Sequence, residues 1–83
     1  MPEERVKVYG TTWCPDCMRA KLFLNRKNIP FDWIDIEKDD TARAYVEELN
    51  QGLRRVPTII FPDGSVTVEP SNAELEAKFS KYH

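Results

Sequence analysis

The sequence contains few of the residues that mark specialised classes of small protein. Its 83 residues include only two cysteines, three glycines and one histidine. Two cysteines are too few for the disulfide framework of a stapled secreted domain, and so little glycine excludes a collagen-like chain. The 41% hydrophobic and 31% charged residues are instead typical of a small globular protein. We therefore expect residues 1–83 to form a single domain with a modest core.

An excess of charge of one sign and long hydrophobic runs are also absent. Twelve Lys and Arg residues are interspersed with fourteen Asp and Glu residues, which gives a net charge of −2. This balance predicts no nucleic-acid partner and no attraction to an anionic membrane. No apolar run exceeds four residues, and the acidic start, Met1–Arg5, lacks the pattern of a signal peptide. We therefore expect a cytoplasmic protein without a membrane partner.

The hydrophobic pattern predicts an α/β domain with the element order βαβαββα. Strands are expected at residues 6–10 and 31–36, a hairpin at 58–68, and helices at 15–28, from a cap at Asp39 or Asp40 to about 51, and from 72 onwards. The first two strands are joined through a helix and should be parallel, whereas the hairpin adds an antiparallel pair.

Two of the predicted helices carry apolar residues at helical spacing. Those of the middle helix, all expected in the core, are Ala42, Tyr45, Val46 and Leu49. Gly52 is expected just past its C-cap, as the C′ residue. In the last helix the pattern comprises Leu75, Phe79 and Tyr82, preceded by a capping box at Ser71 and Glu74.

Both cysteines lie in one segment, Cys14-Pro15-Asp16-Cys17, on the first turn of a predicted helix. Residues three apart there have Cα atoms about 5 Å apart, within the ~4.4–6.8 Å that a disulfide accepts. Cys14 falls at or near the N-cap, where backbone N–H groups and the helix dipole stabilise a thiolate. The spacing therefore predicts Cys14 as a nucleophile and Cys17 as the thiol that resolves a mixed disulfide.

Two other uses of the cysteine pair are less compatible with the sequence. A zinc site needs four ligands, and His83 is the only histidine or cysteine besides the pair, so we predict no metal. A structural disulfide closing so short a loop would restrict the unfolded chain little and would be reduced in the cytosol. Redox chemistry is the remaining prediction.

The motif and its surroundings carry a family resemblance. The residues concerned are Val8-Tyr9-Gly10-Thr11-Thr12-Trp13-Cys14-Pro15-Asp16-Cys17, Asp35-Ile36-Glu37, Val56-Pro57-Thr58 and Asp63-Gly64-Ser65. With them the sequence resembles the glutaredoxin and thioredoxin superfamily over nearly the whole chain. The resemblance implies a thioredoxin-like (glutaredoxin) fold: a four-stranded mixed sheet in the order 2-1-3-4, with helices on both faces. It also implies a cis bond between Val56 and Pro57, facing Cys14, with the Val56 backbone pairing with the substrate.

The segment after the fourth strand bears on the small thiol that the resemblance implies. Glutaredoxins that use glutathione usually have a Gly-Gly pair and an Asp there, whereas this chain has Val68-Glu69-Pro70-Ser71-Asn72. The Asp-Gly-Ser turn followed by Pro70-Ser71, together with the short chain, is similar to mycoredoxins and related proteins. The resemblance implies no tightly bound cofactor, and leaves glutathione, mycothiol or bacillithiol open as the co-substrate.

Several residues near the cysteines allow two interpretations. Asp16 either stabilises the first helical turn or opposes the Cys14 thiolate, which would make the couple more reducing. Trp13 either gives a partner a flat apolar surface or packs part-buried. Arg55, like its neighbour Arg54, either is solvated or pairs with a carboxylate of the partner. The predicted substrate-binding residues are Thr12, Trp13, Pro15, Asp16, Arg55, Val56, Pro57, Ser71 and Asn72.

The sequence thus predicts a monomeric dithiol oxidoreductase that reduces protein disulfides or mixed disulfides with a small thiol. A small thiol or a flavin-dependent reductase would then reset the Cys14–Cys17 pair. One alternative is an iron–sulfur cluster carrier, which by resemblance Pro15 disfavours. Another is a non-catalytic adaptor with the same fold, which the presence of both cysteines disfavours.

Overall fold

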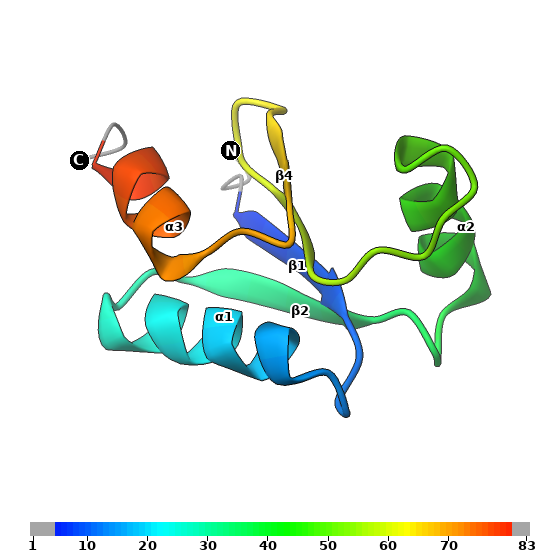
Figure 1. The fold of residues 1–83 in the computed structure, drawn as a ribbon, viewed down its shortest axis with the longest axis horizontal. Coiled ribbons are helices and arrows are strands. Elements are labelled where there is room, and N and C mark those ends of the chain that lie inside the picture. Colours follow the sequence, from blue (N-terminus) through cyan, green and yellow to red (C-terminus); the bar gives the residue numbers. More distant parts are fainter. Residues whose placement is uncertain (1–4, 81–83) are drawn as a thin grey trace.

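The computed structural model describes residues 5–80 and has the predicted order βαβαββα (Figure 1). The strands are β1 (Val6–Gly10), β2 (Phe31–Asp35), β3 (Thr58–Ile60) and β4 (Val66–Val68), and the helices are α1 (Pro15–Arg26), α2 (Asp40–Leu49) and α3 (Asn72–Phe79). Tyr82, predicted to continue the last helix, lies outside the described residues. None of the helices in residues 5–80 is both long and apolar enough to cross a membrane.

The four strands form one sheet in the predicted order β2-β1-β3-β4. Strand β1 is parallel to β2, with Val8 opposite Trp33, and antiparallel to β3, with Val8 opposite Ile59. Strand β4 completes the hairpin with β3, Thr67 lying opposite Ile59. Because β1 is hydrogen-bonded on both sides, its carboxyl end at Gly10 is a well-supported point from which the cysteine loop departs.

The alternation along β1 divides the core between the two faces of the sheet. On one face, α1 and α3 enclose the larger cluster: Val6, Val8, Ala20, Phe23, Leu24, Ile29, Ile59, Phe61, Leu75 and Phe79. On the other face, α2 covers a smaller cluster: Ile36, Ala42 and Val46, with Tyr9, Ile34 and Val56 packed against it. Figure 1 shows α2 set apart from α1 and α3. The prediction of helices on both faces is confirmed.

The prediction that the four regularly spaced apolar residues of α2 all lie in the core is only half correct. Ala42 and Val46 are buried, but Tyr45 is 40% and Leu49 39% exposed. The buried cluster beneath α2 contains only Ile36, Ala42 and Val46, and the Tyr45 ring packs on Tyr9 at its border, with the ring centroids 5.7 Å apart. Of the two candidate caps, Asp39 is the one used, since its side chain accepts a hydrogen bond from the Ala42 N–H at 3.0 Å.

Helices α1 and α2 both end in a Schellman motif, and both end earlier than the sequence pattern predicted. In α1 the left-handed residue is Asn28 (φ 57°), and the N–H of Ile29 donates to the Leu24 carbonyl at 2.9 Å. The helix therefore ends at Arg26, two residues earlier than predicted. In α2, Gln51 (φ 59°) takes the C′ position expected of Gly52, and Gly52 is one residue further on, where its N–H donates back into the helix.

Candidate active site

The turn from β1 into α1 places Cys14 at the N-cap of the helix. Its backbone is extended (φ −86°, ψ 117°), and Pro15 follows at the first helical position, where no N–H is needed. The N–H of Cys17 donates to the Sγ atom of Cys14 at 3.4 Å. A thiol sulfur thus does what a Ser or Asp oxygen does at most N-caps. This confirms the predicted location of Cys14 and aims a backbone donor at its sulfur.

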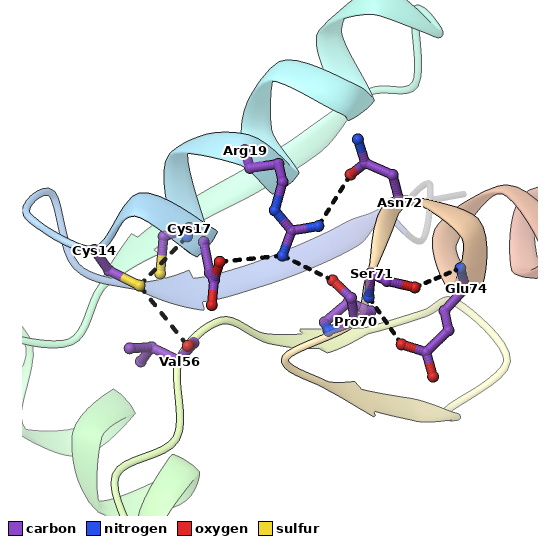
Figure 2. A network of polar contacts seen from close by, with 9 residues as sticks. Cys14, Cys17, Arg19, Val56, Pro70, Ser71, Asn72 and Glu74 are labelled. Atoms are coloured by element: carbon purple, nitrogen blue, oxygen red, sulfur yellow. Dashed lines mark hydrogen bonds and ion pairs between the residues drawn. The ribbon is translucent and has the colours of Figure 1, made fainter.

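Across the site, Cys14 faces the loop that precedes β3. The bond between Val56 and Pro57 is cis, as the resemblance implied. The Cys14 thiol donates to the Val56 carbonyl oxygen at 3.8 Å, a long contact typical of sulfur (Figure 2). Both cysteines are free thiols, and Cys14 retains 8% of its surface exposed, whereas Cys17 has none. Of the two cysteines, only Cys14 can be reached from solvent.

Cys17 is enclosed between α1 and the end of β1. A Cβ atom built on Gly10 would lie 2.7 Å from the Cys17 Sγ atom and 2.8 Å from the Trp33 ring, so glycine leaves the space that both side chains fill. Burial raises the pKa of Cys17 to about 12; a backbone hydrogen bond from Thr11 lowers it, and the Cys14 and Asp16 side chains raise it further. At neutral pH Cys17 therefore keeps its proton.

The aromatic residue before the motif is largely solvent-exposed. Trp13 has 67% of its surface exposed, and its indole N–H donates to a carboxylate oxygen of Glu37 at 2.9 Å. The part-buried interpretation of Trp13 is therefore wrong. Thr12 is also exposed, whereas Thr11 is buried, and within the described residues its hydroxyl has no hydrogen-bond partner.

Residues after β4 join the site through an arginine that motif analysis missed. The Arg19 guanidinium contacts the carboxylate of Asp16 at 3.2 Å, the Pro70 carbonyl at 3.3 Å and the Asn72 side-chain oxygen at 3.2 Å (Figure 2). The acid–base spacing of residues 16 and 19 on a helix was the available signal. The structure therefore brings two predicted site residues, Asp16 and Asn72, to one side chain.

Ser71 lies between these contacts and forms the predicted capping box of α3. Its hydroxyl accepts from the Glu74 N–H at 3.1 Å, and its own N–H donates to the Glu74 carboxylate at 2.8 Å. The hydroxyl, the N–H and the carbonyl of Ser71 are thus all engaged within the protein, the carbonyl accepting from the Leu75 N–H at 3.0 Å. The segment after β4 is thus held by the capping box at Ser71 and by Arg19 at the neighbouring residues Pro70 and Asn72.

The two arginines before the cis bond point to different partners. Arg55 contacts the Glu69 carboxylate at 3.7 Å, and Arg54 contacts that of Glu47 at 3.4 Å. Arg55 also lines a cavity of about 440 Å³ whose other lining residues are Leu49, Asn50, Gln51, Leu53, Val68 and Glu69. Arg55, next to Val56 in the chain, is the residue that connects this cavity to the cis bond in sequence. Among residues 5–80, no three histidine, cysteine or acidic side chains gather as a metal site would require.

Comparison with solved structures identifies the class of the fold. The crystal structure of a thioredoxin-like protein matches with a TM-score of 0.76 and 27% identity, covering 88% of this chain and 97% of that one. A glutaredoxin from Archaeoglobus fulgidus matches with a TM-score of 0.72 and 26% identity, covering 89% and 84%. The chain is therefore a thioredoxin-fold protein with a dithiol motif at the start of α1.

Sequence comparisons identify the family within that class. The glutaredoxin family model matches residues 6–66, and the chain belongs to the glutaredoxin family. A candidate glutaredoxin of Mycobacterium tuberculosis is 42% identical over 74 residues, covering 89% of this chain and 88% of that protein. Mycoredoxin 1 of Corynebacterium glutamicum is 37% identical over 73 residues, covering 88% and 90%. The predicted family and its likeness to mycoredoxins are confirmed.

Proposed function

We propose that this glutaredoxin-family protein is a dithiol oxidoreductase that reduces disulfides of proteins, or mixed disulfides of proteins with a small thiol. The observation that carries the proposal is the unequal placement of two adjacent thiols. Cys14 is reachable at a helix N-cap and receives a backbone hydrogen bond, whereas Cys17 is fully buried behind it. Such a pair favours attack by the first sulfur and resolution by the second.

In the first step, the Cys14 thiolate attacks one sulfur of the substrate disulfide. A bond forms between the Cys14 Sγ atom and that sulfur, the substrate disulfide breaks, and the other sulfur leaves as a thiolate that takes up a proton. Before the attack, the Cys17 N–H and the N-terminal end of α1 stabilise the negative charge on Cys14.

In the second step, Cys17 loses its proton and attacks the Cys14 sulfur. The Cys14–Cys17 disulfide forms and the second substrate sulfur leaves as a thiol, so two electrons have moved from the protein to the substrate. Because Cys14 is then uncharged, its charge no longer opposes ionisation of Cys17, one of the factors that raise the Cys17 pKa before reaction. The resolving thiol is thus easier to ionise after the first step than before it.

The substrate groove in this proposal runs over the Val56–Pro57 bond, between Trp13 and Arg55. The Val56 backbone pairs with an extended segment of the substrate, Trp13 offers it an exposed ring beside Thr12, and Arg55 pairs with a substrate carboxylate. Arg54 provides a matched control, because it contacts Glu47 on the side of α2. Arg55→Glu should raise KM several-fold and Arg54→Glu should not; equal KM values for the two variants would remove Arg55 from the groove.

We further propose mycothiol as the small thiol that reduces the Cys14–Cys17 disulfide. In this proposal the protein acts in the cytoplasm as a monomer, and residues 1–83 form one domain. The likeness to Mycoredoxin 1 supports this choice, and so does the sequence after β4, where glutathione-using relatives carry glycines. Two equivalents of the thiol would reduce the Cys14–Cys17 disulfide and leave as their own disulfide. A flavin-dependent reductase acting directly is the competing donor.

The cysteine roles are tested by two serine variants. With a mixed disulfide as substrate, Cys14→Ser should lose all turnover, and Cys17→Ser should accumulate a covalent adduct at Cys14, visible by mass spectrometry. Turnover by Cys14→Ser would overturn the mechanism. Coupled NADPH assays with glutathione, mycothiol, bacillithiol or a flavin-dependent thioredoxin reductase would identify the donor, and turnover with only a donor other than mycothiol would contradict the choice made above.

A further inference from the structure

Arg19 connects the cysteine motif to the loop that follows β4. Its Nη2 atom lies 3.2 Å from Oδ1 of Asp16 and 3.3 Å from the Pro70 carbonyl oxygen, and its Nη1 atom lies 3.2 Å from Oδ1 of Asn72. Figure 2 shows the side chain extending from α1 across to the start of α3. Asp16, between the two cysteines in sequence, is thereby tied to a cation that touches neither thiol.

The Asp16 charge acts on the thiols, and Arg19 counteracts that charge. A carboxylate within the motif disfavours a nearby thiolate, and Asp16 is among the groups that raise the pKa of Cys17. A guanidinium 3.2 Å from the carboxylate supplies the opposite charge at nearly the same place.

The contacts of Arg19 with Pro70 and Asn72 determine how persistently Arg19 pairs with Asp16. Exposed pairs between a long side chain and a carboxylate are weak, because ordering the side chain costs entropy. Arg19 has only 36% of its side chain exposed, and the Pro70 and Asn72 oxygens hold its planar fork from the other side. The loop after β4 thus keeps the arginine on Asp16.

We propose that Arg19 is a positioning residue that sets the reduction potential of the Cys14–Cys17 couple by holding and neutralising Asp16. The inference rests on the proposed function, in which this couple cycles between disulfide and dithiol. Groups that stabilise the Cys14 thiolate stabilise the reduced form and raise the potential. Asp16 acts in the opposite direction, and Arg19 offsets it.

The potential is measured by equilibrating the protein with reduced and oxidised dithiothreitol. Two electrons and two protons pass from dithiothreitol to the protein disulfide, and alkylation followed by mass spectrometry gives the fraction reduced. Arg19→Gln should shift the equilibrium constant about threefold to tenfold towards the protein disulfide, tenfold being 29.6 mV for a two-electron couple. Asp16→Asn should shift it the other way, and by more in the Arg19→Gln background, where the carboxylate is unpaired.

The chain contains a matched control in α2. Arg43 contacts Asp40 at 3.1 Å with the same spacing along a helix, and its side chain is also 36% exposed, but the pair lies in the first turn of a helix without cysteines. Arg43→Gln should leave the potential unchanged. Arg19→Lys keeps the charge without the planar fork and should restore most of the wild-type value, which a purely structural role of Arg19 would not explain.

Distinct results overturn the inference and the proposed function. If Arg19→Gln has the wild-type potential, or if Asp16→Asn has the same effect in both backgrounds, Arg19 does not act through Asp16. If no dithiothreitol ratio yields the Cys14–Cys17 disulfide, the proposed function fails and this inference with it. Circular dichroism verifies that each variant folds. If Arg19→Gln does not fold, the other two variants test the inference. Arg19→Lys must then keep the wild-type reduction potential, and Asp16→Asn must raise it.

Discussion

The backbone nitrogen of Cys17 lies 3.4 Å from the Sγ atom of Cys14 and donates a hydrogen bond to it. This contact caps α1, because it satisfies one of the N–H groups that have no partner at a helix start. It also directs a donor at the sulfur expected to carry negative charge. The start of the helix and the proposed chemistry therefore depend on the same pair of atoms.

The stability of the reduced protein should fall in alkaline solution because of Cys17. Its pKa is about 12 in the folded protein, whereas a cysteine in an unfolded chain titrates near about 8.5. Between these values the folded state holds the extra proton. The stabilisation that the protonated Cys17 gives the folded state is complete below the lower pKa. It is lost as the pH rises, and the free energy of unfolding then falls by up to about 1.4 kcal/mol per pH unit.

This loss of stability can be measured by urea unfolding under reducing conditions. The two measurements are made at about one pH unit below and one above the pKa of free cysteine. Cys17→Ala is the control, since it removes only this thiol and leaves tyrosines and lysines to titrate as before. The variant should lose most of the alkaline decrease in unfolding free energy. An identical decrease in both proteins would show that the buried thiol is not its source.

Gly10→Ala should destabilise the protein by about 1–3 kcal/mol, the usual cost of overpacking. The added Cβ would lie 2.7 Å from the Cys17 Sγ atom and 2.8 Å from the Trp33 ring. The measurement is the free energy of unfolding, with Trp33→Leu and the double variant beside it. Because the smaller side chain relieves one of the two clashes, Gly10→Ala should cost less in the Trp33→Leu background; equal costs would contradict the packing argument.

Trp13→Ala should affect protein substrates much more than stability. The ring is 67% exposed and makes one hydrogen bond, to Glu37, so the free energy of unfolding should change by less than about 0.5 kcal/mol. Loss of its surface should raise KM for a disulfide-bonded protein about threefold to tenfold, or roughly 0.7–1.4 kcal/mol of binding. Leu22→Ala, which alters an exposed apolar residue within α1, is the control, and equal KM values for the two variants would rule out a docking role for Trp13.

Ser71→Ala should cost about 1 kcal/mol of stability, because it removes one half of the capping box of α3. For a chain of this size that lowers Tm by roughly 4–8 °C. Ser80→Ala removes the hydroxyl of the exposed serine at the other end of the same helix, which donates to the Ala77 carbonyl, and should lower Tm far less. Equal decreases would mean that the box contributes nothing beyond an ordinary surface hydroxyl.

Features that depend on residues close together in the chain could be predicted from the amino-acid pattern alone. The element order, the N-cap at Cys14 and the capping box at Ser71 involve groups within about one helical turn, where propensity and capping patterns are informative. The helix ends were harder to predict, because Gln51 takes the left-handed C′ position expected of Gly52, and Asn28 takes the same conformation where the first helix was expected to continue. There the returning hydrogen bonds of the Schellman motif outweighed the intrinsic preference.

The way in which distant segments meet could be seen only in the folded protein. The packing of α2 on the sheet determines that Val46 is buried while Tyr45 and Leu49 are exposed, although the three share one helical pattern. The contacts of Arg19 with Pro70 and Asn72 join residues more than 50 positions apart. Such contacts depend on how helices and strands are placed across the sheet, and no local pattern encodes that placement. The pair of cysteines could thus be found in the sequence, whereas the charged and buried side chains that surround the pair are brought there by the fold.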